Sequence, residues 1–368
     1  MPKAEDSAGS TVLKLLSIQY LRGIAALLIV FFHVFVQLHR LGYAGDAPNF
    51  LQAGVDIFFV ISGFVMWYTT FNKNIGTQEF LRHRIIRIVP LYWLITTFYL
   101  AILLIRPSWM QSAKFEPLHI IASYFFIPAE HPAAPGFMWP LVVPGWTLNC
   151  EMFFYLLFGL ALRFTNRARA AIVFTILICI VGLQVFDPQS NSIVGFYSSS
   201  IMLEFAFGVA LGYLYTSGVS IPRPASTLLI LAGFISLVAS SVVVGVPALP
   251  RVLIWGIPAF LIVAGAVFYE RAHNVAEIRL PKLLGDASYS LYLSHGAVLS
   301  AFGQFWRASG FPPVSHPVFF ILFSLIAIII ATIFGIGLYH FVEKPLLSKL
   351  SMHIKRMDFK SFHRFFAG

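Results

Sequence analysis

The stretch that most constrains the fold is SIQYLRGIAALLIVFFHVFVQL, residues 17–38. About 20 apolar residues cross the hydrocarbon core of a bilayer, so this stretch predicts a membrane-spanning helix. It carries Arg22 at one end and His33 deep inside. Their separation corresponds to about three turns and roughly 16 Å of rise, which puts both side chains on one face of the helix. A titratable residue near the midplane indicates either a functional site or a histidine that is hydrogen-bonded to a neighbouring helix.

The composition extends this interpretation to the whole chain. Of the 368 residues 58% are hydrophobic and 11% are charged, whereas a soluble domain has roughly 25% charged residues. We therefore expect a polytopic membrane protein without a sizeable soluble domain. The formal charge of +10 needs no nucleic acid as a partner, because the cytoplasmic loops of membrane proteins carry excess Lys and Arg. Cys150 and Cys179 form no disulfide framework, and no metal-ligand spacing is present.

Apolar windows predict an all-α bundle of about ten membrane-spanning helices. A short apolar run at 119–127 is too short to span, and it predicts an interfacial or re-entrant segment. The predicted spans are 17–38, 53–71, 86–105, 147–164, 169–186, 194–215, 226–246, 252–269, 287–306 and 317–342.

The distribution of basic residues predicts the orientation of the bundle. With the N-terminus in the cytoplasm, 20 of the 25 Lys and Arg residues fall in inner segments and 5 in outer ones, as the positive-inside rule requires. Ten spans with both termini in the cytoplasm follow. We divide the chain into an N-terminal segment (1–16, not a signal peptide), a membrane domain (17–342) and a basic tail (343–368). The tail interleaves basic and aromatic residues, which predicts an interfacial helix.

The predicted outer loop from Arg106 to Gly145 is stiff and aromatic. It holds seven prolines together with Trp109 and Trp139. Such a loop either stacks on sugar rings at the outer mouth of the bundle or covers the helix ends.

Several predicted spans carry polar residues that a membrane interior does not tolerate without a partner. Those of a type suited to general acid–base catalysis, or to a proton-linked transport path, are His33, Asp56, Glu151, Glu204 and His295. His33 is one candidate partner for Asp56. Ser62, Tyr289 and Tyr292 add hydroxyl groups, and Tyr289, Tyr292 and His295 recur at helical spacing. We interpret Gly54 and Gly63 as sites of close helix packing.

Three arginines lie within six residues at the start of the third predicted span, namely Arg82, Arg84 and Arg87. Arginine is suited to bidentate recognition of phosphate, and Pro90 is expected to break the helix beside them. The positive-inside bias explains part of this cluster without any ligand. At the end of the last predicted span, Glu343 is expected to pair with the adjacent Lys344.

Six short patterns follow one another along nearly the whole chain. They are RGIAALLIVFFH from Arg22 to His33, GVDIFFVISGF from Gly54, RIIRIVPLYW from Arg84, WTLNCE from Trp146, LGDASYSLYLSH from Leu284 and FVEKP from Phe341. Together these patterns resemble the motifs of the acyltransferase 3 family of integral membrane O-acyltransferases. Each pattern alone is weak, but their order makes the resemblance specific.

The resemblance implies transfer of an acyl group, usually acetyl, from cytoplasmic acyl-CoA to a hydroxyl of an extracytoplasmic or lipid-linked polysaccharide. It is strongest to bacterial exopolysaccharide acetyltransferases, which places the chain in the cytoplasmic (inner) membrane as a multi-pass protein. Acetyl-CoA is then the donor substrate, and no bound cofactor is expected.

The geometry and the resemblance together suggest roles for the polar residues. Arg22, Arg82, Arg84 and Arg87 are expected to bind the phosphates of acyl-CoA. His33 is expected to act as general base on the acceptor hydroxyl, with Asp56 or Glu151 orienting its ring. A covalent acyl-histidine intermediate is the competing mechanism. Ser62, Tyr289, Tyr292 and His295 complete the polar interior.

A different class of protein also fits buried carboxylates and histidines. A proton-linked transporter or flippase for a glycan or small molecule would use the same groups. However, the two halves of the chain share no visible repeat, a feature that many transporters have. A purely structural scaffold leaves the interior titratable groups unexplained.

Overall fold

The computed structural model describes residues 15–110, 113–185, 192–241 and 249–352, which contain helices and loops but no strand. The predicted all-α class is thus confirmed for these ranges. The interfacial helix predicted for the basic tail lies mostly outside them, as does most of the segment 1–16.

Within the described ranges the predicted spans fall largely on helical residues, although the one at 194–215 is divided into two helices with a 3-10 turn (Ser200–Met202) between them. The short run at 119–127 forms a helix that begins at Pro117. The helices are α1 (Leu16–Arg40), α2 (Gly54–Thr70), α3 (Thr77–Ile105), α4 (Pro117–Tyr124), α5 (Trp146–Ala161), α6 (Asn166–Gly182), α7 (Ile193–Tyr197), α8 (Leu203–Thr216), α9 (Arg223–Ser240), α10 (Ile257–Ala272), α11 (Arg279–Asp286), α12 (Ser288–Ala308) and α13 (Pro317–Leu338). Two π-helical turns, η6 (Val252–Gly256) and η7 (Tyr339–Glu343), adjoin α10 and α13.

Seven helical segments in the described ranges are long and apolar enough to cross a membrane, which marks the chain as a membrane protein. They contain α1, α2, α3, α6, α9, α10 and α13. Of the other predicted spans, α5 and α8 are short, with 16 and 14 residues. Helix α12 has 21 residues but includes the hydroxyl-rich sequence around His295. The ten-span topology therefore stays a prediction.

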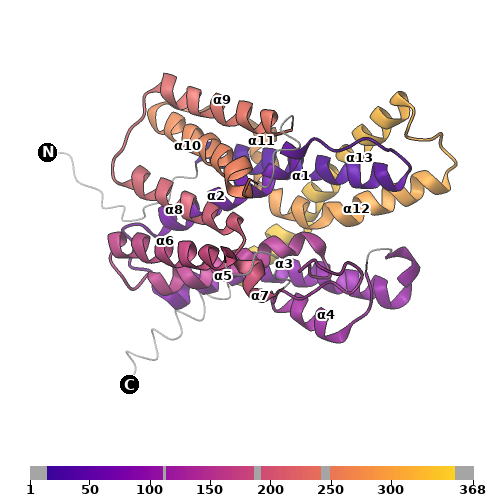
Figure 1. Cartoon of the computed structure of the whole chain (residues 1–368), viewed down its shortest axis with the longest axis horizontal. Coiled ribbons are helices and arrows are strands. Elements are labelled where there is room, and N and C mark those ends of the chain that lie inside the picture. Colours follow the sequence, from indigo (N-terminus) through magenta and orange to yellow (C-terminus); the bar gives the residue numbers. More distant parts are fainter. Residues whose placement is uncertain (1–14, 111–112, 186–191, 242–248, 353–368) are drawn as a thin grey trace.

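Helix α1 lies at the centre of the bundle and packs against α2, α10, α11, α12 and α13. In Figure 1, α9 and α10 lie together on one side of it, and α3, α4 and α5 lie on the other. The pair α12 and α13 packs beside the C-terminal half of α1. Side chains on α1 are thus surrounded by helices from both halves of the sequence.

Glycines bring α2 and α8 into close contact, which confirms the packing interpretation of Gly63. A Cβ atom on Gly63 would lie 2.1 Å from the carbonyl oxygen of Phe205, and one on Gly208 would lie 2.1 Å from that of Val60. Because real Cβ atoms never approach so closely, only glycine fits at both positions. Gly54 serves the same purpose against α1, where a Cβ would lie 2.4 Å from the oxygen of Ala25.

Helix α3 corrects the prediction of a break at Pro90. The helix runs without interruption from Thr77 to Ile105, with Pro90 inside it. Neighbouring helices and local adjustments make proline tolerable within membrane helices. Arg84 and Arg87 therefore lie about 10 and 15 Å along the helix from its start, rather than at its end.

Candidate active site

A cavity of about 160 Å³ lies where α1, α2, α3, α5 and α12 meet. Its walls combine apolar side chains with several of the polar residues that the sequence placed inside the spans. The polar lining consists of Arg22, Ser62, Arg84, Arg87, Thr147, Glu151, Tyr155, Ser288, Tyr289 and Tyr292. Residues from five helices, predicted separately, therefore belong to one site. The other candidates do not line it, namely Arg82, Asp56, His33, Glu204 and His295.

Two of the three arginines in the cavity are available to a ligand. Within the described ranges, Arg22 and Arg84 make no hydrogen bond or ion pair. The guanidinium of Arg84 lies over the rings of Phe80 and Tyr155, 5.4 and 6.0 Å from their centroids. Arginines that form no direct ion pair with a carboxylate in a partly apolar cavity can bind an anion.

Arg87 differs because it has a buried partner. Its Nη1 donates to Oε1 of Glu343 at 2.5 Å, and its guanidinium lies over the Tyr289 ring. The other oxygen of Glu343 accepts from Ser290 Oγ at 2.6 Å, and Glu343 is only 1% exposed. The expected pair with Lys344 is thus wrong. Because the π-helical turn η7 ends at Glu343, its side chain points into the bundle while Lys344 stays exposed.

Glu151 is the acidic group of the cavity. Its Oε1 accepts a hydrogen bond from Ser62 Oγ at 3.0 Å and another from the hydroxyl of Tyr155. Arg22 and Arg84 face the same cavity and are close enough to interact with it electrostatically. The carboxylate therefore lies among hydroxyl and guanidinium groups, not beside a histidine ring.

His33 faces a second histidine, with 4.7 Å between the ring centroids of His33 and His295. The Nδ1 of His33 lies 2.9 Å from the carbonyl oxygen of Ile29. A carbonyl only accepts, so Nδ1 carries the proton and Nε2 keeps its lone pair. In His295, Nδ1 lies 3.3 Å from the oxygen of Leu291, and the buried Nε2 has no partner in the described ranges.

Tyr292 connects this histidine pair to the cavity. Its ring lines the cavity and lies 5.9 Å, centroid to centroid, from that of His295. Its hydroxyl is held between Thr147 Oγ1 and the carbonyl oxygen of Pro144. The pair therefore lies just beyond one wall of the cavity.

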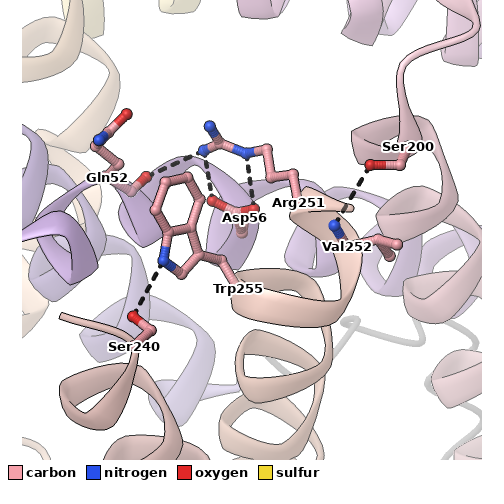
Figure 2. Close-up of polar contacts among 7 residues, drawn as sticks. All are labelled: Gln52, Asp56, Ser200, Ser240, Arg251, Val252 and Trp255. Atoms are coloured by element: carbon pink, nitrogen blue, oxygen red, sulfur yellow. Dashed lines mark hydrogen bonds and ion pairs between the residues drawn. The ribbon is translucent and has the colours of Figure 1, made fainter. Parts of the chain in front are cut away.

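Asp56 pairs with Arg251 instead of orienting His33 (Figure 2). Nε of Arg251 donates to Oδ1 at 3.0 Å and Nη2 to Oδ2 at 2.7 Å, while the guanidinium stacks over Trp255 at 4.5 Å. Asp56 is completely buried, as is the neighbouring Glu204. A bidentate Arg partner 195 residues away in sequence satisfies the carboxylate, so Asp56 has no orienting contact with the histidine.

The sequence analysis missed Arg251 and Glu343 as partners. One feature pointed to Arg251: it is one of only five Lys and Arg residues in the predicted outer segments. A cation that departs from the positive-inside distribution, directly before an apolar span, suggests a specific acidic partner.

Comparisons with known proteins identify the family of the chain. The Acyltransferase domain model matches residues 15–336. The chain is 34% identical over 300 residues to the exopolysaccharide production protein ExoZ of Rhizobium meliloti (strain 1021), covering 81% of this chain and 90% of that protein. No solved structure matches the chain significantly. The chain therefore belongs to the acyltransferase domain family.

Proposed function

We propose that the protein transfers an acetyl or other acyl group from acyl-CoA to a hydroxyl of an extracytoplasmic or lipid-linked polysaccharide. One observation carries the proposal: a cavity with two guanidinium groups that form no ion pair lies against the partly buried His33 and the buried His295, whose rings both point Nδ1 at a backbone carbonyl. Family membership supports acyl transfer, and the similarity to an exopolysaccharide production protein supports a polysaccharide acceptor.

Arg22 and Arg84 are the groups we assign to the phosphates of the donor, with Arg87 beside them. Their position supports this role, because Arg22 and His33 lie on one face of α1, roughly 16 Å apart along the helix. A donor anchored by its phosphates at the arginines extends its arm along the cavity toward Tyr292. The thioester then reaches the wall beyond which His33 and His295 lie.

His33 acts as general base in this mechanism. Its Nε2 takes the proton of the acceptor hydroxyl while the hydroxyl oxygen attacks the thioester carbonyl carbon. The carbon–sulfur bond of the tetrahedral intermediate then breaks, and the leaving thiolate receives the proton held on Nε2. The ester and free coenzyme thiol are the products, so no proton is gained or lost.

The competing mechanism passes through an acyl-histidine. Here Nε2 of His33 attacks the thioester carbonyl carbon, the carbon–sulfur bond breaks, and the coenzyme thiolate takes the proton that the acylated ring releases. The acceptor hydroxyl then attacks the acyl group, the bond to Nε2 breaks, and the hydroxyl proton returns to the ring. Incubation of the purified protein with donor labelled in its acyl group, without acceptor, distinguishes the two. Label retained on wild type but not on His33→Ala supports the covalent route, and label on neither supports direct transfer.

The basic-residue distribution supports ten spans with both termini in the cytoplasm of a bacterial inner membrane. In that orientation the helix start nearest Arg22 faces the cytoplasm, where acyl-CoA is found. Reporter fusions after α2 and α3 test the orientation, since only one of them lies outside.

The decisive experiment compares surface polysaccharide from cells with wild-type protein, with His33→Ala and with no protein. We expect O-acyl groups, measured by NMR, only with wild type. Acylation retained with His33→Ala contradicts the assignment of His33. Unchanged acylation without the protein, with substrate movement that consumes no acyl-CoA, instead indicates a transporter.

A further inference from the structure

A second polar pocket lies between the C-terminal ends of α1 and α12. It measures about 10 Å³ and is lined by Gln37, Arg40, Leu41, Ser300, Gly303, Gln304 and Arg307. That volume is close to that of a single water-sized probe, so the pocket admits one small group, such as an oxygen of a larger ligand. Gln37 follows His33 by four residues, which puts both on one face of α1, about 6 Å apart along the axis.

The side-chain amide of Gln37 is free to hydrogen-bond to a ligand. It is 8% exposed, and its side-chain amide has no hydrogen-bond partner within the described ranges. The amide atoms are not among the fully buried, unpartnered polar atoms of the described residues, so they stay accessible from the pocket. Gly303 opposes it, and a Cβ there would lie 3.1 Å from Gln37 Oε1, so the glycine leaves space for the amide.

Two exposed arginines line the rim. Arg307 donates through Nη2 to the backbone oxygen of Arg40 at 2.5 Å, and neither guanidinium pairs with a carboxylate in the described ranges. Gln304 donates weakly, at 3.4 Å, to the backbone oxygen of Trp109, which joins the proline-rich loop to the pocket. Trp109 is 59% exposed, so an aromatic surface stands beside these groups.

We propose that this pocket binds an acidic sugar residue of the acceptor chain. Guanidinium groups bind carboxylates in a bidentate manner, whereas amides accept and donate to sugar hydroxyls. A carboxylate-bearing sugar held by Arg40 and Arg307, with a hydroxyl on Gln37, places its neighbouring unit along α1 toward His33. This inference rests on the proposed function, because it supplies the acceptor side of that same reaction.

A direct binding measurement tests the pocket apart from catalysis. The full-length protein in lipid nanodiscs is titrated at low salt with a glucuronic acid–glucose disaccharide and with cellobiose, its neutral counterpart. We expect wild type to bind the acidic disaccharide about tenfold more tightly, and Arg40→Gln/Arg307→Gln to abolish that preference. Raising the salt concentration should weaken the binding of the acidic disaccharide but not that of cellobiose, because salt screens the interaction between exposed charges.

Matched variants separate the pocket from a change in folding or net charge. Arg40→Lys/Arg307→Lys should keep most of the preference, and Lys114→Gln, which removes an exposed cation outside the pocket, should keep all of it. Gln37→Leu should weaken the binding of both disaccharides. The binding of acyl-CoA should be unchanged in every variant. Equal binding of the two disaccharides by wild type, or a preference that survives Arg40→Gln/Arg307→Gln, overturns the proposal. Failure of the proposed function is a separate result: wild type would then consume no acyl-CoA with any acceptor, whatever it binds.

Discussion

His33 and His295 lie ring to ring, 4.7 Å between centroids, and each points Nδ1 at the carbonyl of the residue four positions earlier. In the neutral form of each ring the proton is therefore on Nδ1, and Nε2 keeps its lone pair. The base proposed for the reaction is thus accompanied by a second base, where the sequence suggested a carboxylate. Because two adjacent imidazolium cations repel each other, we expect the pair to carry at most one positive charge.

Replacement of His295 tests whether its ring contributes to the proposed action of His33 as general base. We expect His295→Phe to lower kcat about tenfold or more and to leave KM for acyl-CoA unchanged, because the donor site lies on the far side of Tyr292. His295→Asn keeps a polar group and should recover part of kcat. Steady-state kinetics with both substrates measure this, and a rise in KM with unchanged kcat would assign His295 to binding instead.

Loss of Arg84 should weaken donor binding selectively. Charge-assisted hydrogen bonds contribute about 1.5–3 kcal/mol, so Arg84→Gln is expected to raise KM for acyl-CoA about 10- to 100-fold without changing KM for the acceptor. Arg163→Gln is the control, since the exposed Arg163 donates a hydrogen bond to the backbone of Leu160, lies over the ring of Phe164 and is not part of the cavity. If Arg84→Gln alters neither constant, the phosphate site is not at this cavity.

Arg87 needs a different design because its partner is buried. Arg87→Gln leaves Glu343, 1% exposed, without its cation, so a loss of activity in that variant includes a loss of stability. The double variant Arg87→Gln/Glu343→Gln removes both charges. It should restore the melting temperature while the KM for acyl-CoA stays raised.

Much of this architecture was predictable from apolar segments and their polar interruptions. In the described ranges the predicted spans are largely helical, and Gly63 lies at a close helix contact, because length and side-chain size are local properties. The membership of Arg22, Arg84 and Glu151 in one interior site follows from the same reasoning, since polar groups in membrane helices turn toward one another.

The pairing of these groups was not predictable. Helical periodicity gives the depth and face of a residue but not the identity of the neighbouring helix. Asp56 and Arg251 lie 195 residues apart, and Arg87 and Glu343 lie 256 apart. Both partners adjoin or belong to π-helical turns, which shift the faces of a helix and have no simple sequence pattern.

The Asp56–Arg251 pair should be important for stability, and replacing Arg251 should destabilise the protein more than replacing Asp56. Asp56 is completely buried, whereas the Arg251 side chain is 24% exposed and also contacts Trp255. Loss of one partner of a buried pair costs about 3–5 kcal/mol. We expect Arg251→Met to lower the melting temperature more than Asp56→Asn, since it leaves the more deeply buried charge.

The double variant Asp56→Asn/Arg251→Met removes the unpaired carboxylate that Arg251→Met leaves behind. Its melting temperature should therefore be higher than that of Arg251→Met. Lys282→Met breaks an exposed pair with Glu277 and serves as control, with no expected change. A double variant that is as unstable as the sum of the two single variants would mean that the two residues act independently.

The loop after α3 should respond to mild acid through His131. This residue is 2% exposed, its Nδ1 accepts from the amide of Ala133, and its ring lies 5.2 Å from that of His119. Burial, and then the neighbouring His119, lower the pKa of His131 to about 4, whereas the unfolded chain has a histidine pKa near 6.5.

This difference sets the direction and the pH range of the effect. Above about pH 6.5 the ring is neutral in both states, and its contribution is constant. Between pH 6.5 and 4 the unfolded chain binds a proton that the folded loop does not, so stability falls as the pH falls. His131→Asn should therefore lose less melting temperature than wild type between pH 7.5 and 5.0. His83→Asn, which replaces an exposed histidine, should behave as wild type, and an equal loss in His131→Asn would show that other groups cause the pH dependence.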